Sequence, residues 1–97
     1  MIAVYQFNEE LENFEEVEIE ENVPLFELLD SNKILLFVDS HESKVWIWEG
    51  ANTNPRMKFI SAQTAPIIRD KHDISFTITS VDDGEETAAF KILVGLV

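Results

Sequence analysis

The chain of 97 residues has the length of one domain with one hydrophobic core, and it contains no cysteine, which excludes disulfides, thiol redox chemistry and zinc–thiolate sites. Nineteen acidic residues against seven basic ones give a net charge of −12, which repels phosphate backbones and argues against nucleic-acid binding. No apolar run approaches the roughly 20 residues that span a bilayer, and no basic stretch precedes an apolar segment at the N terminus. We expect residues 1–97 to form a single soluble, cytoplasmic domain.

The charges are unevenly distributed along the chain. Ten of the acids lie in residues 1–30, which contain no lysine or arginine. Four of the seven bases instead bracket one predicted helix, and these are Arg56, Lys58, Arg69 and Lys71. This distribution predicts an acidic body that carries a locally basic helix. The alternative is that the acids only solvate an exposed edge and keep the protein soluble.

The first third of the chain predicts a hairpin followed by a short helix. Residues 2–7 have strand composition, and the polar residues 8–13 suit a turn. Between residues 14 and 20, Val17 and Ile19 alternate with glutamates, which is typical of a half-exposed strand. Residues 24–29 then predict one or two helical turns whose leucines cover a face of the sheet.

The middle of the chain predicts the centre of the sheet and one long helix. Residues 33–39 are apolar on both alternating faces, as in a strand that is covered from two sides. Residues 44–50 are rich in aromatic and β-branched side chains and end at a glycine, so we expect a neighbouring antiparallel strand. Asn54 followed by Pro55 forms a helix start, which predicts a helix from residue 55 to about 69.

Pro66 interrupts this helical pattern, and we expect it either to kink the helix or to end it early. Alternating apolar residues then predict a strand over residues 74–79, and residues 85–93 predict a short C-terminal helix. The expected fold class is therefore α+β. It contains a five-stranded mixed sheet, with the long helix on one face and shorter helices on the other face or flanking it.

Several short motifs resemble a gelsolin-like repeat in their order and spacing over nearly all of the chain. They are the Leu-Leu-Asp-Ser-Asn run at 28–32, the strand that ends in Asp39, the Val-Trp-Ile-Trp-Glu-Gly-Ala-Asn run at 45–52, and the Gly-x-Glu-x-x-x-Phe pattern from Gly84 to Phe90. The resemblance implies a gelsolin-like fold, which is related to that of actin-depolymerising factor and cofilin. It also implies a stand-alone gelsolin homologue of the kind expected in archaea.

The resemblance implies an actin-binding regulator of actin assembly that contacts a monomer or a filament end through the long helix. We expect sequestering or weak capping, because severing needs one repeat to hold the filament side while another caps the end. The alternative is a protein-interaction or scaffold domain that keeps the gelsolin-like fold without binding actin, as in vesicle-coat proteins.

The long helix carries the candidate contact residues. Ser61, Thr64, Ala65 and Ile68 form one stripe of mostly small residues that suits close packing on the sheet. A second stripe would leave isoleucines partly exposed and rimmed by charge, which is typical of a binding patch. The candidate actin-binding residues are therefore Arg56, Met57, Ile60, Gln63 and Ile67. The alternative is that the fold buries both stripes.

Calcium commonly regulates the family. The resemblance places the usual aspartate ligand at Lys33 and the usual glutamate at Met57. An ammonium group and a thioether cannot supply the oxygen ligands that calcium requires. We therefore expect no required cofactor, and calcium only at an interface shared with actin. Asp70 and Asp73 are the carboxylates nearest to the family's shared position, which falls on Arg69.

No catalytic constellation is present in the sequence. The two histidines, His41 and His72, lie among loop-type residues, and we expect both to be exposed and idle. The three glycines are scattered and form no phosphate-binding loop. We expect a binding protein rather than an enzyme.

Overall fold

A five-stranded sheet runs through the middle of the structure in the order β2-β1-β3-β4-β5. Its strands are β1 (Ile2–Asn8), β2 (Asn13–Val17), β3 (Ile34–Asp39), β4 (Lys44–Glu49) and β5 (Thr77–Asp82). Neighbouring strands from β2 to β4 pair antiparallel, whereas β4 and β5 pair parallel. The computed structural model describes every residue from 1 to 97. It confirms the predicted five-stranded mixed sheet.

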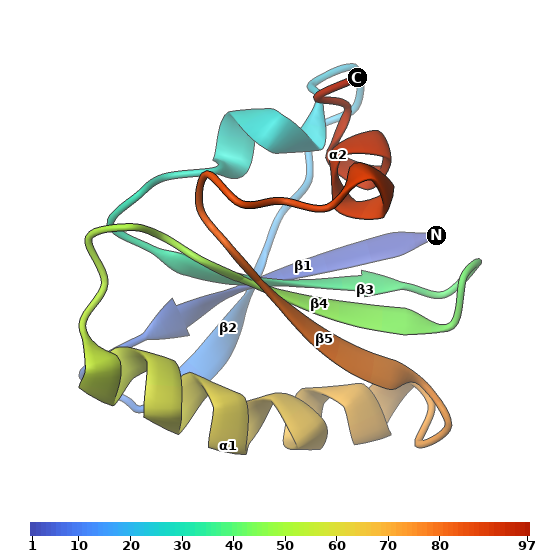
Figure 1. The fold of residues 1–97 in the computed structure, drawn as a ribbon. Coiled ribbons are helices and arrows are strands. Elements are labelled where there is room, and N and C mark those ends of the chain that lie inside the picture. The colour runs from blue at the N-terminus through green and yellow to red at the C-terminus, as the bar shows by residue number, and fades with distance from the viewer.

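Helices cover both faces of the sheet (Figure 1). The helix α1 (Pro55–His72) covers one face, and the 3₁₀ helix η1 (Leu25–Leu28) and the helix α2 (Ala88–Val94) cover the other. Every residue of β3 is buried, as predicted for the central strand. Leu36 belongs to the core cluster under α1, and its neighbour Leu35 to the cluster under η1 and α2. The fold therefore has two hydrophobic layers separated by the sheet. None of its helices is both long enough and apolar enough to cross a bilayer.

The start of α1 follows from its sequence. The Asn54 side chain accepts a hydrogen bond from the Met57 backbone N–H at 2.8 Å, and Pro55 occupies the first turn, where no N–H is needed. The helix then continues through Pro66 to His72, so an early end at Pro66 is wrong (Figure 1). Pro66 cannot donate to the carbonyl of Ala62, but Ala62 is exposed and water can serve that carbonyl.

The boundaries of two predicted strands are wrong. β2 ends at Val17 rather than at residue 20, because the chain leaves the sheet there to reach η1 on the opposite face (Figure 1). β5 runs from Thr77 to Asp82 rather than from residue 74 to residue 79. Helix α1 runs further than predicted, and the Asp73 carboxylate then forms a turn by accepting hydrogen bonds from the Ser75 N–H and hydroxyl at 2.9 and 2.7 Å. Ile74 is consequently 75% exposed.

The motif from Gly84 to Phe90 anchors the hydrophobic layer under η1 and α2 to the sheet. Glu86 accepts hydrogen bonds from the Trp48 indole N–H at 2.8 Å and from the Gly84 N–H at 3.1 Å. Partial burial opposes ionisation, but these hydrogen bonds keep the pKa of Glu86 below its ordinary value. Phe90 is fully buried and meets the Phe37 ring edge-on at 5.4 Å. The predicted C-terminal helix starts three residues later than expected, at Ala88, because Thr87 caps it.

Gly50 is required where β4 ends. A side chain there would place its Cβ 2.4 Å from the Ser31 carbonyl oxygen and 2.6 Å from that of Lys33. The Gly50 N–H donates to the same Lys33 carbonyl at 2.9 Å. This close approach joins the loop before β3 to the loop before α1, and it explains the glycine in the predicted motif.

Candidate functional site

The outward face of α1 carries apolar side chains that the fold does not cover. Phe59 is 63% exposed and Ile67 is 58% exposed, and the exposed Gln63 lies midway between them. On the opposite side of the helix, Ser61, Ala65 and Ile68 are buried against the sheet, as predicted. We call Phe59, Gln63 and Ile67 the α1 strip. Their spacing of four residues places them along one side of the helix.

The structure divides the predicted contact residues into two groups. Arg56, Gln63 and Ile67 are exposed. Met57 and Ile60 are half-buried and pack against the core cluster beneath α1, so they can offer a partner only part of their surface. The most exposed apolar residue of the helix, Phe59, was not among the predicted residues. It could have been found from the inward position of Ser61, because two residues of helix turn by about 200°.

The helix is less basic at its surface than its sequence predicts. Arg56 forms an ion pair with Glu12, from the turn between β1 and β2, and Arg69 Nε lies 3.0 Å from Asp70 Oδ1. The structure contains no other ion pairs. Two of the four bases that bracket the helix are therefore neutralised locally. The α1 strip is then the main feature of the outward face of α1.

Two carboxylates meet at the ends of the parallel strands β4 and β5. Glu49 lies opposite Asp82 in the register, and the two side chains can share a hydrogen bond when one of them is protonated. Burial, this hydrogen bond and the repulsion from Asp82 raise the pKa of Glu49, while Lys58 on α1 opposes the shift. Glu49 therefore holds its proton more tightly than an isolated glutamate would.

The end of α1 is tied to the sheet by a histidine. Tyr5 in β1 and His72 share a hydrogen bond of 2.9 Å between the hydroxyl and Nε2, and their rings meet edge-on. Both histidines are exposed, as predicted, and His41 lies in the turn between β3 and β4. The expectation that His72 is idle is wrong, because it makes this hydrogen bond. Burial, followed by the nearby Glu16 charge, raises the pKa of the Tyr5 hydroxyl. The hydroxyl thus stays protonated at neutral pH.

The two positions that would hold calcium in a gelsolin-like repeat meet in space. Lys33 and Met57 line one shallow cleft of about 420 Å³, together with Glu9, Glu10 and Asn32. The structure groups no three carboxylate or imidazole side chains in a way that could hold a metal ion. An ammonium group and a thioether in this cleft do not fit calcium, which is bound by hard oxygen ligands.

The two carboxylates proposed for a shared calcium site lie at the far end of α1. Asp70 is engaged by Arg69, and Asp73 accepts two hydrogen bonds from Ser75. These hydrogen bonds lower the pKa of Asp73, so it is ionised at neutral pH. The other oxygens of these residues would have to combine with ligands from a partner.

Comparisons with known proteins identify the fold. No protein-family model matches the chain, and no curated protein matches its sequence. Among solved structures, a chain in the Thorarchaeota ProGel/rabbit actin complex matches with a TM-score of 0.80 and 22% identity, over 98% of this chain and 100% of that chain. A chain in the Thorarchaeota 2DGel3/rabbit actin complex matches with a TM-score of 0.64 and 21% identity, over 92% of this chain and 43% of that chain. The prediction of a gelsolin-like α+β fold is confirmed.

Proposed function

We propose that this chain, which has the fold of ProGel, is an actin-binding regulator of actin assembly that contacts a monomer or a filament end through α1. The observation that carries the proposal is the α1 strip, in which Phe59 and Ile67 are both more than half exposed. The two structural neighbours were crystallised as complexes with rabbit actin, which supports actin as the partner. A helix that presents two apolar residues two turns apart on one side, here Phe59 and Ile67, suits docking into a groove.

The packing of α1 favours binding, because the helix is already ordered. Its start is capped by Asn54, its inner side is buried at Ser61, Ala65 and Ile68, and its end is tied to β1 by His72. Little conformational entropy is therefore lost when a partner covers the strip. Arg56 and Gln63 lie beside the apolar residues and supply a polar rim.

The proposed activity is sequestering or weak capping in the cytoplasm, without catalysis. One strip on one domain offers a single actin contact, whereas severing uses two. We propose that calcium is not required by the domain alone and that it acts only at an edge shared with actin, where Asp70 and Asp73 lie. The ammonium of Lys33 and the thioether of Met57, which line the cleft at the family's usual calcium position, support the proposal that the domain alone does not need calcium.

The test uses rabbit actin, in sedimentation and in fluorescence assays of polymerisation. A sequestering protein lowers the steady-state filament mass in proportion to its own concentration. A capping protein slows elongation from filament seeds at concentrations far below that of actin. If a folded protein in molar excess neither binds actin nor alters either quantity, actin is not the partner, and the non-actin interaction domain becomes the better explanation.

A further inference from the structure

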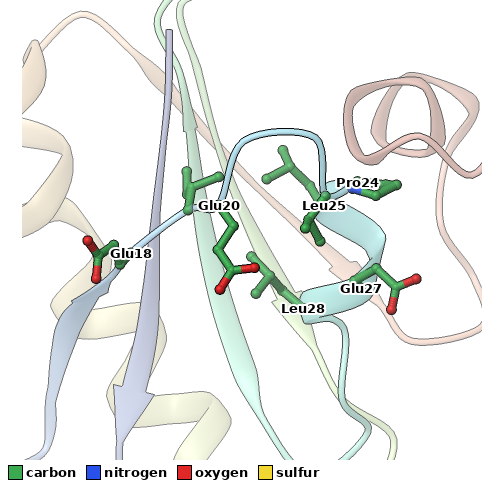
Figure 2. A pocket seen from close by; sticks show the side chains of 8 residues that line it. Glu18, Glu20, Pro24, Leu25, Glu27 and Leu28 are labelled. Carbon is green, nitrogen blue, oxygen red and sulfur yellow. The ribbon is translucent and has the colours of Figure 1, made fainter.

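A second surface lies on the side of the sheet away from α1. A groove of about 280 Å³ opens between the segment that follows β2 and the short helix η1. Figure 2 shows Glu18 and Glu20 on the first of these walls, and Glu27 and Leu28 on the η1 wall. We call this feature the acidic groove. It shares no lining residue with the α1 strip, and the sheet separates the two surfaces.

The floor of the acidic groove is apolar and accessible. Ile19 is 37% exposed and Val23 is 40% exposed, and Leu28 contributes to the lining from η1. β2 ends at Val17, so Ile19 belongs to no regular element and its side chain is not held within the sheet. Covering such aliphatic surface is favourable by about 25 cal/mol per Å². The floor can therefore receive an apolar side chain of a partner.

The rim of the groove carries three uncompensated negative charges. Glu18, Glu20 and Glu27 are all exposed and line the groove. None of them takes part in either ion pair of the structure or accepts a side-chain hydrogen bond. No lysine or arginine lies in the two segments that form the groove, residues 18–28. Figure 2 shows the Glu20 carboxylate beside Leu28, with the carboxylates of Glu18 and Glu27 at the two outer ends of the groove. Negative charge therefore flanks the apolar floor on both sides.

We propose that the acidic groove binds a basic segment of another protein, with an apolar side chain in the floor and lysine or arginine residues on both sides of it. Charge complementarity selects this occupant, because anionic lipids, nucleic acids and acidic peptides are all repelled by the rim. Arginine suits the rim best, since its guanidinium can hold a carboxylate through two hydrogen bonds. The proposal adds a second binding surface and does not depend on what α1 binds.

The test measures fluorescence polarisation of a labelled twelve-residue peptide composed of arginine, lysine and leucine. We expect saturable binding at low salt. The variant Glu18→Lys/Glu20→Lys/Glu27→Lys should weaken binding by about tenfold or more, because it reverses the local potential. A matched control, Glu10→Lys/Glu42→Lys/Glu85→Lys, makes the same change in net charge at exposed positions outside the groove. It should weaken binding by only about threefold or less, because distant surface charges are screened.

The apolar floor is tested separately. Replacing Ile19 and Val23 by serine, or the leucines of the peptide by serine, should each weaken binding by about fivefold or more. Circular dichroism establishes that each variant is folded.

Three outcomes would overturn the proposal. The first is an equal loss in the two charge variants, which would show that only net charge acts. The second is undiminished binding of the serine peptide. The third is self-association of the chain that the groove variant abolishes, because the groove would then hold a second copy.

Discussion

Phe59 and its neighbour Ile60 distinguish a binding role for α1 from a purely structural one. An aromatic side chain buries about 200 Å² when fully covered, and each Å² is worth about 25 cal/mol. Because 63% of Phe59 is exposed in the free chain, a partner that covers the remainder could gain up to about 3 kcal/mol. Phe59→Ala should therefore weaken actin binding by roughly tenfold to a hundredfold. It should change the stability of the domain by less than about 1 kcal/mol.

Ile60 should behave in the opposite way. Its side chain is half-buried and packs against the core cluster beneath α1. Removing a fully buried isoleucine costs about 2–5 kcal/mol, so Ile60→Ala should cost about 1–2 kcal/mol of stability. Its effect on actin binding should be smaller than that of Phe59→Ala, because less of its surface can reach a partner.

The assay pairs calorimetric or fluorescence titration of actin with urea denaturation of the same variants. Ile92→Ala is the matched control, because Ile92 is 69% exposed but lies on α2, across the sheet from α1. It should alter neither quantity. If folded Phe59→Ala binds actin like the parent, or if Ile92→Ala loses affinity equally, the α1 strip is not the contact.

Three further predictions concern other parts of the molecule. Lys33→Asp combined with Met57→Glu should create calcium binding that calorimetry detects. Micromolar calcium binding by the parent would contradict the inference that the cleft lined by Lys33 and Met57 does not fit calcium. Glu49→Gln should raise the melting temperature at neutral pH, because its amide can donate a hydrogen bond to Asp82 and it removes a half-buried negative charge. The folded-state pKa of Glu49 is raised, so ionised Glu49 destabilises the fold increasingly as pH rises from the ordinary carboxyl range through the raised pKa. In acid Glu49 is protonated in both states, so the stabilisation by Glu49→Gln should vanish there. Gly50→Ala should cost about 1–3 kcal/mol in urea denaturation, because the new Cβ meets two backbone carbonyls.

The centre of the fold could be predicted from the sequence because its signals are local and agree with one another. Residues 34–38 are apolar at every position, which in a chain of this length suits only a strand covered on both faces. Asn54 and Pro55 mark the start of α1 by their own side-chain chemistry. The motif that ends at Phe90 also had a physical basis, because Glu86 binds the Trp48 indole.

The sequence-based predictions are wrong where tertiary contacts determine element boundaries and exposed surfaces. The alternation of Ile74, Phe76 and Ile78 suggests one strand, but hydrogen bonds to Asp73 turn the chain between the first two. Pro66 suggests a helix end, but it leaves without a donor only the carbonyl of Ala62, which is an exposed residue. Phe59 was missed because the predicted apolar stripe followed spacings from Met57, whereas the exposed face is fixed by what the sheet buries.

Binding at the two proposed surfaces should respond differently to salt, so that each proposal can fail independently of the other. Contacts at the acidic groove depend on three unpaired carboxylates, so added salt should weaken binding there. At the α1 strip, the exposed centre is Phe59 and Ile67, while Arg56 and Arg69 are already neutralised by ion pairs. Screening therefore removes little attraction at the strip, and it also reduces any repulsion that arises from the net charge of −12. Actin binding that persists in salt while peptide binding is lost would assign the two activities to the two faces of the sheet.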